Sequence, residues 1–536
     1  MATTQDVPRA GERSPSDDDR RRRLVTRVGG GGLLALGLLL FRGFGIPWDE
    51  DLMHNYGELL LRFFTTGDRA WENFVSYPTG HIKLYGPVVA VPQAIIDRWA
   101  DSPYIGYRYG HLLVFLIFAG SVFAFYGLCR RHFKSWRWGA IGAAMLVLSP
   151  RIFTHAFVNN RDIPFMAFIV ITLYFVARFI ESRRVVWMVA AGAASALTID
   201  VRVGGVFVVG LAFLFLGLDV VGDVDFRASL RRLVVPVAVY LGVAGVLTVA
   251  FWPYLWANPI ARFIEVLRFF GDFTVATPKV LYRGQVVSVI ELPWHFIPWW
   301  IAISTPIPYL LLTAVGFTTI AVRRWRAVFQ TRSNERYLYM YAVWLGLPLA
   351  LVIVGRSPVY DDWRHLMFVY PALVFFAVAG ARRIYERLRH LRYRISLRRA
   401  WAVALVAILC WVAGTMIRFH PFENVYFNAL AGGAEGRYEM DYGGLSYKQG
   451  LEYLLHTQQG PVRVTACTRP GFYANLLFAQ ADWTRLVYVP PEQADYALCA
   501  PLGGLGISAV TYFPGRPMIY SINRGSGTFF FIKRLR

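Results

Sequence analysis

Charged side chains are scarce in this chain of 536 residues. Asp, Glu, Lys and Arg together account for 17% of it, against about 25% in typical soluble domains. Hydrophobic residues reach 56% and aromatic residues 16%, with a mean hydropathy of +0.41. A soluble chain of this length would divide into several domains with charged surfaces, so the composition excludes a soluble protein. Apolar runs recur from residue 28 to residue 418, which predicts that a lipid bilayer surrounds most of the chain.

Acidic residues are few even among the charged ones: 34 Asp and Glu stand against 56 Lys and Arg, a net charge of +22. The arginines gather in short segments between apolar runs, as they do in the cytoplasmic loops of membrane proteins. These segments are residues 20–23, 130–137, 183–184, 227–232, 323–336 and 382–399. This distribution argues against nucleic acid as a partner and predicts contacts with anionic membrane lipids.

Four cysteines are too few for a disulfide framework. Cys129 and Cys410 fall at or within apolar runs, where we expect unreactive thiols. Cys467 and Cys499 both lie in the C-terminal region, and the sequence leaves open whether they form a bridge. A small-residue cleavage site is also lacking after the first apolar run, at residues 28–44, so we interpret that run as a retained signal-anchor.

The pattern of apolar runs predicts an α-helical polytopic membrane protein with about eleven transmembrane helices. The expected spans lie near residues 28–46, 105–128, 137–150, 163–180, 185–199, 203–220, 233–252, 298–320, 337–355, 365–380 and 400–418. This count puts every arginine-rich segment on one side, with the N-terminus in the cytoplasm and the C-terminus outside it. Residues 1–27 are then a disordered cytoplasmic tail, and residues 28–418 form the transmembrane domain.

Three segments on the outer side are too long or too polar to be simple turns. Residues 47–104 hold a helical pattern at 51–65 and a Pro-broken apolar stretch at 84–96, which we expect to be re-entrant or interfacial. Residues 253–297 are rich in aromatic side chains, and loops of this length are usually functional. Residues 419–536 alternate short apolar runs with a helical stretch, which predicts a small extracytoplasmic α/β domain.

Acidic residues gather on this outer side. Asp49, Glu50 and Asp51 follow the first span directly, and Asp162 precedes the fourth. Acids at a membrane edge are unfavourable unless they are solvated or used. Asp51 and Asp162 also have a structural interpretation, because each could cap the helix that follows it.

Cations on the same side run against the positive-inside bias and therefore need an anion. They are Lys83, Arg161, Arg202, Lys279, Arg283 and Arg364. A phosphate-bearing lipid is an available anion, and arginine binds phosphate through paired hydrogen bonds. Acids suited to base chemistry beside such cations predict a site for group transfer from a lipid phosphate. Asp200 and Arg202 could instead form a structural ion pair.

Motifs spread over most of the chain carry a family resemblance. They are Trp48-Asp49-Glu50, Arg161-Asp162-Ile163-Pro164-Phe165, Trp252-Pro253-Tyr254, Ser304-Thr305-Pro306, Tyr360-Asp361-Asp362-Trp363-Arg364-His365, His420-Pro421-Phe422-Glu423-Asn424-Val425-Tyr426-Phe427-Asn428, Gly432-Gly433 and Asp441-Tyr442. In their order and spacing the chain resembles a bacterial member of the family 39 glycosyltransferases, the protein mannosyltransferase-like branch of the GT-C superfamily. It departs from that pattern at Asp362, where a small residue such as Gly is expected, and at Gly443, where an aromatic residue is expected.

The resemblance implies a polyprenyl-phosphate sugar as donor, inversion at the anomeric carbon and a place in the bacterial inner membrane. The family's catalytic acid falls on Asp49, with Glu50 beside it, as general base for the acceptor hydroxyl. The acid of the second outer loop falls on Asp162, which would shape the acceptor site. Our candidates for donor binding are Arg364, Lys83, Arg202 and Arg283, with Arg161, Asp361 and His365 in the same substrate site.

The cofactor and the acceptor are less determined. Some GT-C enzymes bind a divalent metal through loop acids, a role that Asp49 and Asp162 could fill, but this branch often needs none, so no cofactor is expected. The β-trefoil modules of eukaryotic protein mannosyltransferases are lacking, so a protein acceptor is not implied, and a glycan, lipid or protein all remain open. A lipid or glycan transporter, or a non-catalytic assembly partner, is the alternative function, although transport sites usually lie near the bilayer midplane rather than in outer loops.

Overall fold

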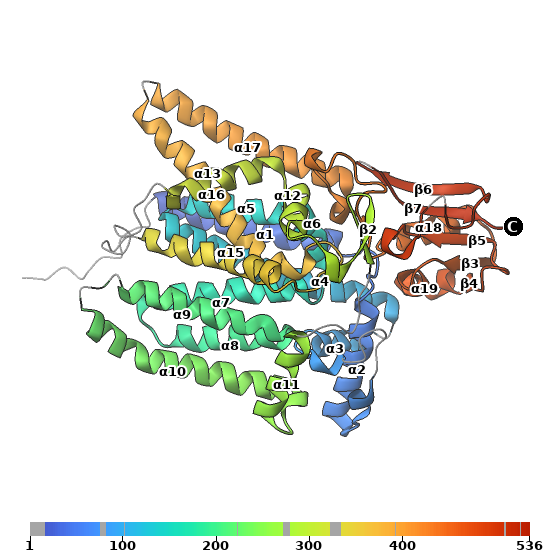
Figure 1. The fold of residues 1–536 in the computed structure, drawn as a ribbon, viewed down its shortest axis with the longest axis horizontal. Helices are drawn as coiled ribbons and strands as arrows, with labels where there is room; N and C mark the ends of the chain where they lie inside the picture. Colours follow the sequence, from blue (N-terminus) through green and yellow to red (C-terminus); the bar gives the residue numbers. More distant parts are fainter. Residues whose placement is uncertain are drawn as a thin grey trace, which may run out of the picture.

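The computed structural model describes residues 17–74, 82–100, 102–221, 223, 225–271, 279–321, 334–391, 393–508, 511–525 and 527–536. They form a long helical bundle with a small sheet at one end (Figure 1). Of the expected disordered tail, residues 1–16 lie outside the described residues, as do residues 323–333 of one arginine-rich segment. The expectation of disorder is wrong for residues 17–27, because helix α1 spans Asp17–Leu40. Asp18 in its first turn complements the helix dipole and accepts a hydrogen bond of 2.9 Å from Trp136 Nε1.

The chain is a multi-pass membrane protein. In its described part, seven helices are long and apolar enough to cross a bilayer, and nine if each of two bent pairs counts as one span. The seven involve α1, α4 (Pro103–Phe133), α7 (Asp162–Ser182), α9 (Val206–Val221), α10 (Phe226–Phe251), α16 (Tyr370–Arg387) and α17 (Arg394–Phe419).

Every one of the eleven expected spans coincides with an apolar helix, but not all are full crossings by length. Helices α8 (Val186–Val201) and α15 (Leu338–Val354) have 16 and 17 residues, whereas a crossing takes about 20 residues. The sequence therefore predicted where the helices lie better than how many of them cross.

The two bent pairs break at prolines. Helix α5 (Trp136–Val147) turns by 70° into α6 (Pro150–Val158), and α12 (Phe296–Ser304) turns by 119° into α13 (Ile307–Ala321). Proline lacks the N–H that would continue the preceding helix, so each break falls where the sequence removes a hydrogen bond. The expected spans at 137–150 and 298–320 are thus each interrupted.

The long outer segments fold into short elements. Helix α2 (Glu50–Thr66) matches the expected helical pattern, whereas α3 (Ala90–Ala100) begins six residues later than the apolar stretch that predicted it. Residues 253–297 contain α11 (Pro259–Gly271) and a hairpin of β1 (Lys279–Tyr282) and β2 (Gln285–Ser288).

The C-terminal region forms the expected small α/β unit. Its five-stranded sheet has the order β4-β3-β5-β7-β6. The strands are β3 (Val462–Ala466), β4 (Leu486–Tyr488), β5 (Tyr496–Cys499), β6 (Met518–Arg524) and β7 (Gly527–Arg534), and helix α18 (Tyr447–Thr457) contacts β5 and β7. Strands β3, β4 and β5 are parallel, and β7 joins β5 antiparallel. Cys467 and Cys499 form a disulfide, which settles the pairing that the sequence left open.

The bundle therefore has two different ends. Helix α4 starts beside the C-terminal unit, where Arg108 donates a hydrogen bond of 3.2 Å to the Leu477 carbonyl. It ends at Phe133, inside the basic segment 130–137. Figure 1 shows the turn between α9 and α10 and the tip between α16 and α17 at the end of the bundle opposite the sheet.

Candidate functional site

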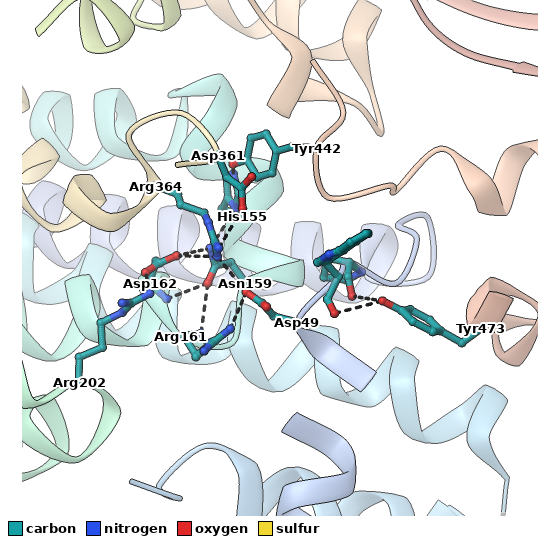
Figure 2. Close-up of polar contacts among 12 residues, drawn as sticks. Asp49, His155, Asn159, Arg161, Asp162, Arg202, Asp361, Arg364, Tyr442 and Tyr473 are labelled. Atoms are coloured by element: carbon teal, nitrogen blue, oxygen red, sulfur yellow. Dashed lines mark hydrogen bonds and ion pairs between the residues drawn. The ribbon is translucent and has the colours of Figure 1, made fainter. Parts of the chain in front are cut away.

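Asp49 lies between two arginines from distant parts of the chain (Figure 2). Its Oδ2 atom is 2.5 Å from Arg161 Nη2 and 2.9 Å from Arg364 Nη1. Asp49 immediately precedes α2, Arg161 immediately precedes α7, and Arg364 opens the 3-10 turn η7 (Arg364–Val369). Two helix starts and one turn thus bring these charges together where the bundle meets the C-terminal unit.

Arg364 also contacts two further carboxylates. Its Nη2 atom is 3.0 Å from Asp361 Oδ2, and its Nη1 atom is 3.7 Å from Asp162 Oδ2. The other oxygen of Asp162 pairs with Arg202, which directly follows α8. Three acids and three arginines alternate in one network, which we call the charged cluster: Asp49, Arg161, Asp162, Arg202, Asp361 and Arg364 (Figure 2).

Asn159 sets the position of two members of the charged cluster. Its Oδ1 atom accepts hydrogen bonds from the backbone N–H groups of Arg161 and Asp162 at 3.2 and 2.7 Å. Its amide also donates to Asp162 Oδ2 at 2.9 Å. The interpretation of Asp162 as a helix cap is therefore wrong, because Asn159 satisfies the free N–H groups and leaves the Asp162 carboxylate to the arginines.

Asp49 and Asp361 have pKa shifts of opposite sign. Burial alone favours the protonated form of either acid. For Asp49, the charges of Arg161 and Arg364 outweigh burial and hold its pKa well below the usual value. For Asp361, burial outweighs the attraction of Arg364, the negative charge of Asp49 adds to it, and the pKa rises to about 7. At neutral pH Asp49 is therefore ionised, whereas Asp361 can hold or release a proton.

A small cavity of about 40 Å³ opens beside the charged cluster. Asp49, Asp361 and Arg364 line it together with Trp48, His155, Asn159, Asn424 and Tyr442. A single water needs about 10–15 Å³ of such space, so the cavity holds a water or a hydroxyl group with room to spare.

Two guanidinium groups of the charged cluster keep an unused donor. The Nε atoms of Arg364 and Arg202 are buried and have no hydrogen-bond partner among the described residues. Buried N–H groups are almost always paired in native proteins. These donors therefore suit an anionic ligand with several oxygen acceptors, such as a phosphate.

Glu50 turns away from its neighbour Asp49. It is 4% exposed, and its carboxylate is 3.1 Å from His111 Nε2 and 3.8 Å from His54 Nε2. The structure thus does not bring Glu50 into the charged cluster. Asp51 is not the helix cap either: it lies in the first turn of α2, and its Oδ1 atom accepts a hydrogen bond of 3.2 Å from the Tyr107 hydroxyl.

Two of the expected donor-binding cations lie outside the charged cluster. Lys83 Nζ donates to the Glu72 carbonyl at 3.0 Å. Arg283, in the β1–β2 turn, lies over the Trp299 ring at 5.5 Å from its centroid. His365 lies next to Arg364, and its ring packs edge-on against Tyr360, with 4.8 Å between centroids.

Asp200 and Arg202 do not form the mutual ion pair that their spacing allowed. Asp200 Oδ1 accepts a hydrogen bond of 2.7 Å from the backbone N–H of Val88. Arg202 pairs with Asp162 instead. Asp200 thus holds the segment before α3 against the end of α8, while Arg202 belongs to the charged cluster.

A buried ion pair beneath the site was missed by sequence reasoning. Arg151 Nη1 is 2.6 Å from Asp362 Oδ2, and both side chains are almost fully buried. The Trp300 and Phe427 rings lie about the Arg151 guanidinium, at 5.2 and 4.7 Å. The departure at Asp362 was the available signal, because a position that favours Gly takes a charged residue only where a partner exists.

Metal binding finds little support in the donor set. In the described residues no group of three His, Cys, Asp or Glu side chains converges as metal ligands. Asp49 and Asp162 are each held by guanidinium groups, whose charge disfavours a divalent cation at the same oxygens.

Comparisons with known proteins agree with the fold. Residues 108–256 match a family model described as dolichyl-phosphate-mannose-protein mannosyltransferase. The apo structure of ArnT from Cupriavidus metallidurans is similar, with 15% sequence identity, a TM-score of 0.52, and coverage of 95% of this chain and 98% of that one. The structure of ArnT from the same organism bound to undecaprenyl phosphate gives 16% identity, a TM-score of 0.48, and coverage of 96% and 98%. No curated protein matches the sequence. The expected fold is thus shared with ArnT over almost the whole chain, and the resemblance to the mannosyltransferase-like family is confirmed for residues 108–256.

Proposed function

We propose that this protein is an inverting glycosyltransferase, which moves a sugar from a polyprenyl-phosphate donor to an acceptor hydroxyl at the outer face of the bacterial inner membrane. The observation that carries the proposal is the meeting of Arg161 and Arg364 on Asp49 at the edge of a cavity. Guanidinium groups suit the phosphate of the donor, and a carboxylate between them suits the proton of the acceptor. The family model and the fold shared with ArnT support a sugar transferase, and undecaprenyl phosphate bound to ArnT supports a polyprenyl carrier.

The orientation follows from the distribution of basic residues. Cytoplasmic loops carry the excess of arginine, so the basic end of the bundle faces the cytoplasm. The charged cluster, at the end with the C-terminal unit, then faces outwards. A carrier lipid and its sugar can reach it from the outer leaflet.

Donor binding would change the basicity of Asp49. In the present arrangement two arginines hold its pKa low, which makes it a weak base. A donor phosphate competes for the same guanidinium groups and draws positive charge away from the carboxylate. Burial then dominates and raises the pKa of Asp49, so the base becomes active when the donor is present.

The transfer itself breaks one bond and forms another. The acceptor hydroxyl gives its proton to Asp49 while its oxygen attacks the anomeric carbon from the side opposite the phosphate. The bond between that carbon and the phosphate oxygen breaks, and its electron pair leaves with the polyprenyl phosphate. Arg364 and Arg161 stabilise the charge that grows on the leaving group, and Arg202 holds Asp162 in place to shape the acceptor side.

Asp361 is a second candidate for the base. Its pKa of about 7 is close to the optimum for proton transfer at neutral pH, and it lines the same cavity as Asp49. The two assignments separate by substitution: Asp49→Asn abolishes transfer if Asp49 is the base, whereas Asp361→Asn then lowers it only through the altered contact with Arg364.

The proposal is tested by the lipids that the protein retains. Wild-type protein, Arg364→Ala and Arg283→Ala are purified in mild detergent, and bound lipids are identified by mass spectrometry. We expect a polyprenyl-phosphate sugar with wild type and with Arg283→Ala, which lies outside the charged cluster, and its loss in Arg364→Ala. Bulk phospholipid alone in all three proteins would contradict the proposal and favour the transporter or assembly alternatives.

A further inference from the structure

Two cavities lie side by side along α1, at the end of the bundle opposite the charged cluster. The first is an apolar groove of about 320 Å³ between α1, α4 and α5, with Gly29, Val122 and Ala144 among its walls. The second, of about 520 Å³, is polar, and five cationic side chains line it against two acidic ones. Asp18 and Arg22 of α1 line the polar cavity, and the groove begins at Val25, so the two follow one another along the same helix.

The groove exists because small residues face each other across it. A Cβ atom built at Gly29 or Gly32 would meet no atom within 4 Å. On the opposite wall, α5 presents Ala140 and Ala144. In a bilayer such an apolar groove is filled by an apolar chain rather than by water.

The length of the groove matches one leaflet. It runs along α1 from Val25 to Leu36, which is about 16 Å at 1.5 Å per residue. The hydrocarbon core of a bilayer is about 30 Å thick, so the groove reaches about to its midplane. That is the depth to which a phospholipid acyl chain extends.

The polar cavity carries an excess of positive charge that its own acids do not cancel. Asp18 accepts a hydrogen bond from Trp136 Nε1 at 2.9 Å, and Glu181 pairs with Arg131 at 2.8 Å. Among the described residues, no carboxylate forms an ion pair with Lys134 or Arg137. Basic pockets between helices on the cytoplasmic side of membrane proteins bind anionic lipid headgroups.

We propose that the two cavities form one binding site for an anionic glycerophospholipid, with the headgroup phosphate in the polar cavity and one acyl chain in the groove. The lipid belongs to the leaflet at the basic end of the bundle. It is distinct from the polyprenyl donor, which the proposed function places at the opposite end, so the site stands or falls independently of the reaction.

Native mass spectrometry of the full-length protein tests the headgroup part. The protein is titrated with phosphatidylglycerol or with phosphatidylcholine of the same acyl chains, and phosphatidylglycerol should bind roughly tenfold more tightly. In K134Q/R137Q its affinity should fall by roughly fivefold for each charge removed. R20Q/R21Q is the control, because these exposed arginines of α1 lose the same charge without lining either cavity.

A pair of glycine variants tests the groove. Gly29→Leu should fill it and weaken phosphatidylglycerol binding, with Gly32→Leu as a second variant on the same wall. Gly31→Leu is the control: a Cβ there also meets no atom within 4 Å, but the residue does not line the groove. Thermal unfolding should show a rise in Tm with phosphatidylglycerol for wild type and Gly31→Leu, and a smaller rise for Gly29→Leu.

Four outcomes would overturn the proposal. They are equal affinity for the two phospholipids, unchanged affinity in K134Q/R137Q, the same effect from Gly29→Leu, Gly32→Leu and Gly31→Leu, and displacement of phosphatidylglycerol by polyprenyl phosphate from this site.

Discussion

The outer loops contain two pairs of adjacent acids, Asp49-Glu50 and Asp361-Asp362. In each pair the first acid lies in the site and the second is buried in the core. Asp49 and Asp361 are 29% and 31% exposed and belong to the charged cluster. Their neighbours Glu50 and Asp362 are 4% exposed or less, and each has its own buried cationic or histidine partner. Adjacent acids in a sequence therefore need not share a role, and the second acid of each pair holds the backbone from which the first one projects.

The backbone explains how neighbours come to face different ways. Glu50 is the first residue of α2, and successive residues of a helix point about 100° apart. Asp361 and Asp362 both adopt left-handed backbone angles, with φ of 55° and 63°. Residues other than Gly rarely do so, although Asp tolerates it. The small residue that the family resemblance implies at 362 would suit this backbone, and the ion pair with Arg151 anchors Asp there.

The largest expected effect separates Asp49 from Glu50 by activity. Asp49→Asn should lower the transfer rate by about 10²–10⁴-fold, the usual contribution of a general base. Glu50→Gln should retain the rate within about tenfold, because Glu50 acts on the fold. The measurement is kcat with purified protein in lipid and a polyprenyl-phosphate sugar. A larger loss of kcat in Glu50→Gln than in Asp49→Asn, at unchanged Tm, would show that Glu50 rather than Asp49 acts in the reaction.

The second effect separates Asp362 from Asp361 by stability. Asp362→Ala should cost about 3–5 kcal/mol, because it leaves the buried Arg151 without a counter-charge. Asp361→Ala, at a partly exposed position, should cost less than about 1 kcal/mol. Unfolding of the detergent-solubilised variants measures both. Recovery of stability in Arg151→Met/Asp362→Gly, which keeps the left-handed backbone at 362, would confirm that the unpaired charge is the cause, and equal losses in the two single variants would contradict it.

The smallest effect separates Asp361 from Asp49 by pH. The folded state raises the pKa of Asp361 to about 7, so the native protein binds more protons than the unfolded chain between about pH 4 and 7. The contribution of Asp361 to stability therefore falls as pH rises through this window. For Asp49, with its lowered pKa, the contribution is present above about pH 4 and is lost only in more acidic solution.

Tm curves measured from pH 4 to pH 8 check these signs. The difference between wild type and Asp361→Asn should change across the window, since other titrating groups cancel. Above pH 5 the difference between wild type and Asp49→Asn should change less, and only because loss of the Asp49 charge lowers the pKa of Asp361. A level difference for Asp361→Asn would show that its pKa is not raised.

The sequence predicted the positions of the helices because apolar runs and their basic flanks depend on local composition. It did not predict the two bends or the short α15, because length and proline position compete with hydropathy. In the site, Asp49, Arg161, Asp162, Arg202, Asp361 and Arg364 were all named from the sequence and lie together in the structure. Lys83 and Arg283 were also named from the sequence, but they lie outside the charged cluster. They were chosen because they lie on the same expected side of the membrane, and that alone does not determine how close two side chains are.

The sequence did not predict which of several neighbouring residues forms a given contact. The Asn159 side chain, rather than that of Asp162, accepts the N–H at the start of α7, a local contact that competes with other local hydrogen bonds. Arg151 pairs with Asp362 across 211 positions of sequence, a contact that depends on tertiary packing.

The C-terminal unit forms hydrogen bonds with the segment that precedes Asp49. The Tyr473 hydroxyl donates to the carbonyls of Pro47 and Trp48 at 3.2 and 3.1 Å, as Figure 2 shows. Lys448 of α18 holds the carbonyls of Arg42 and Gly43 at 3.0 and 3.1 Å. In a chimaera built from two related chains, residues 42–51 and the C-terminal unit should therefore come from the same parent. A junction placed between them would separate the Asp49 carboxylate from the contacts that set the position of its backbone.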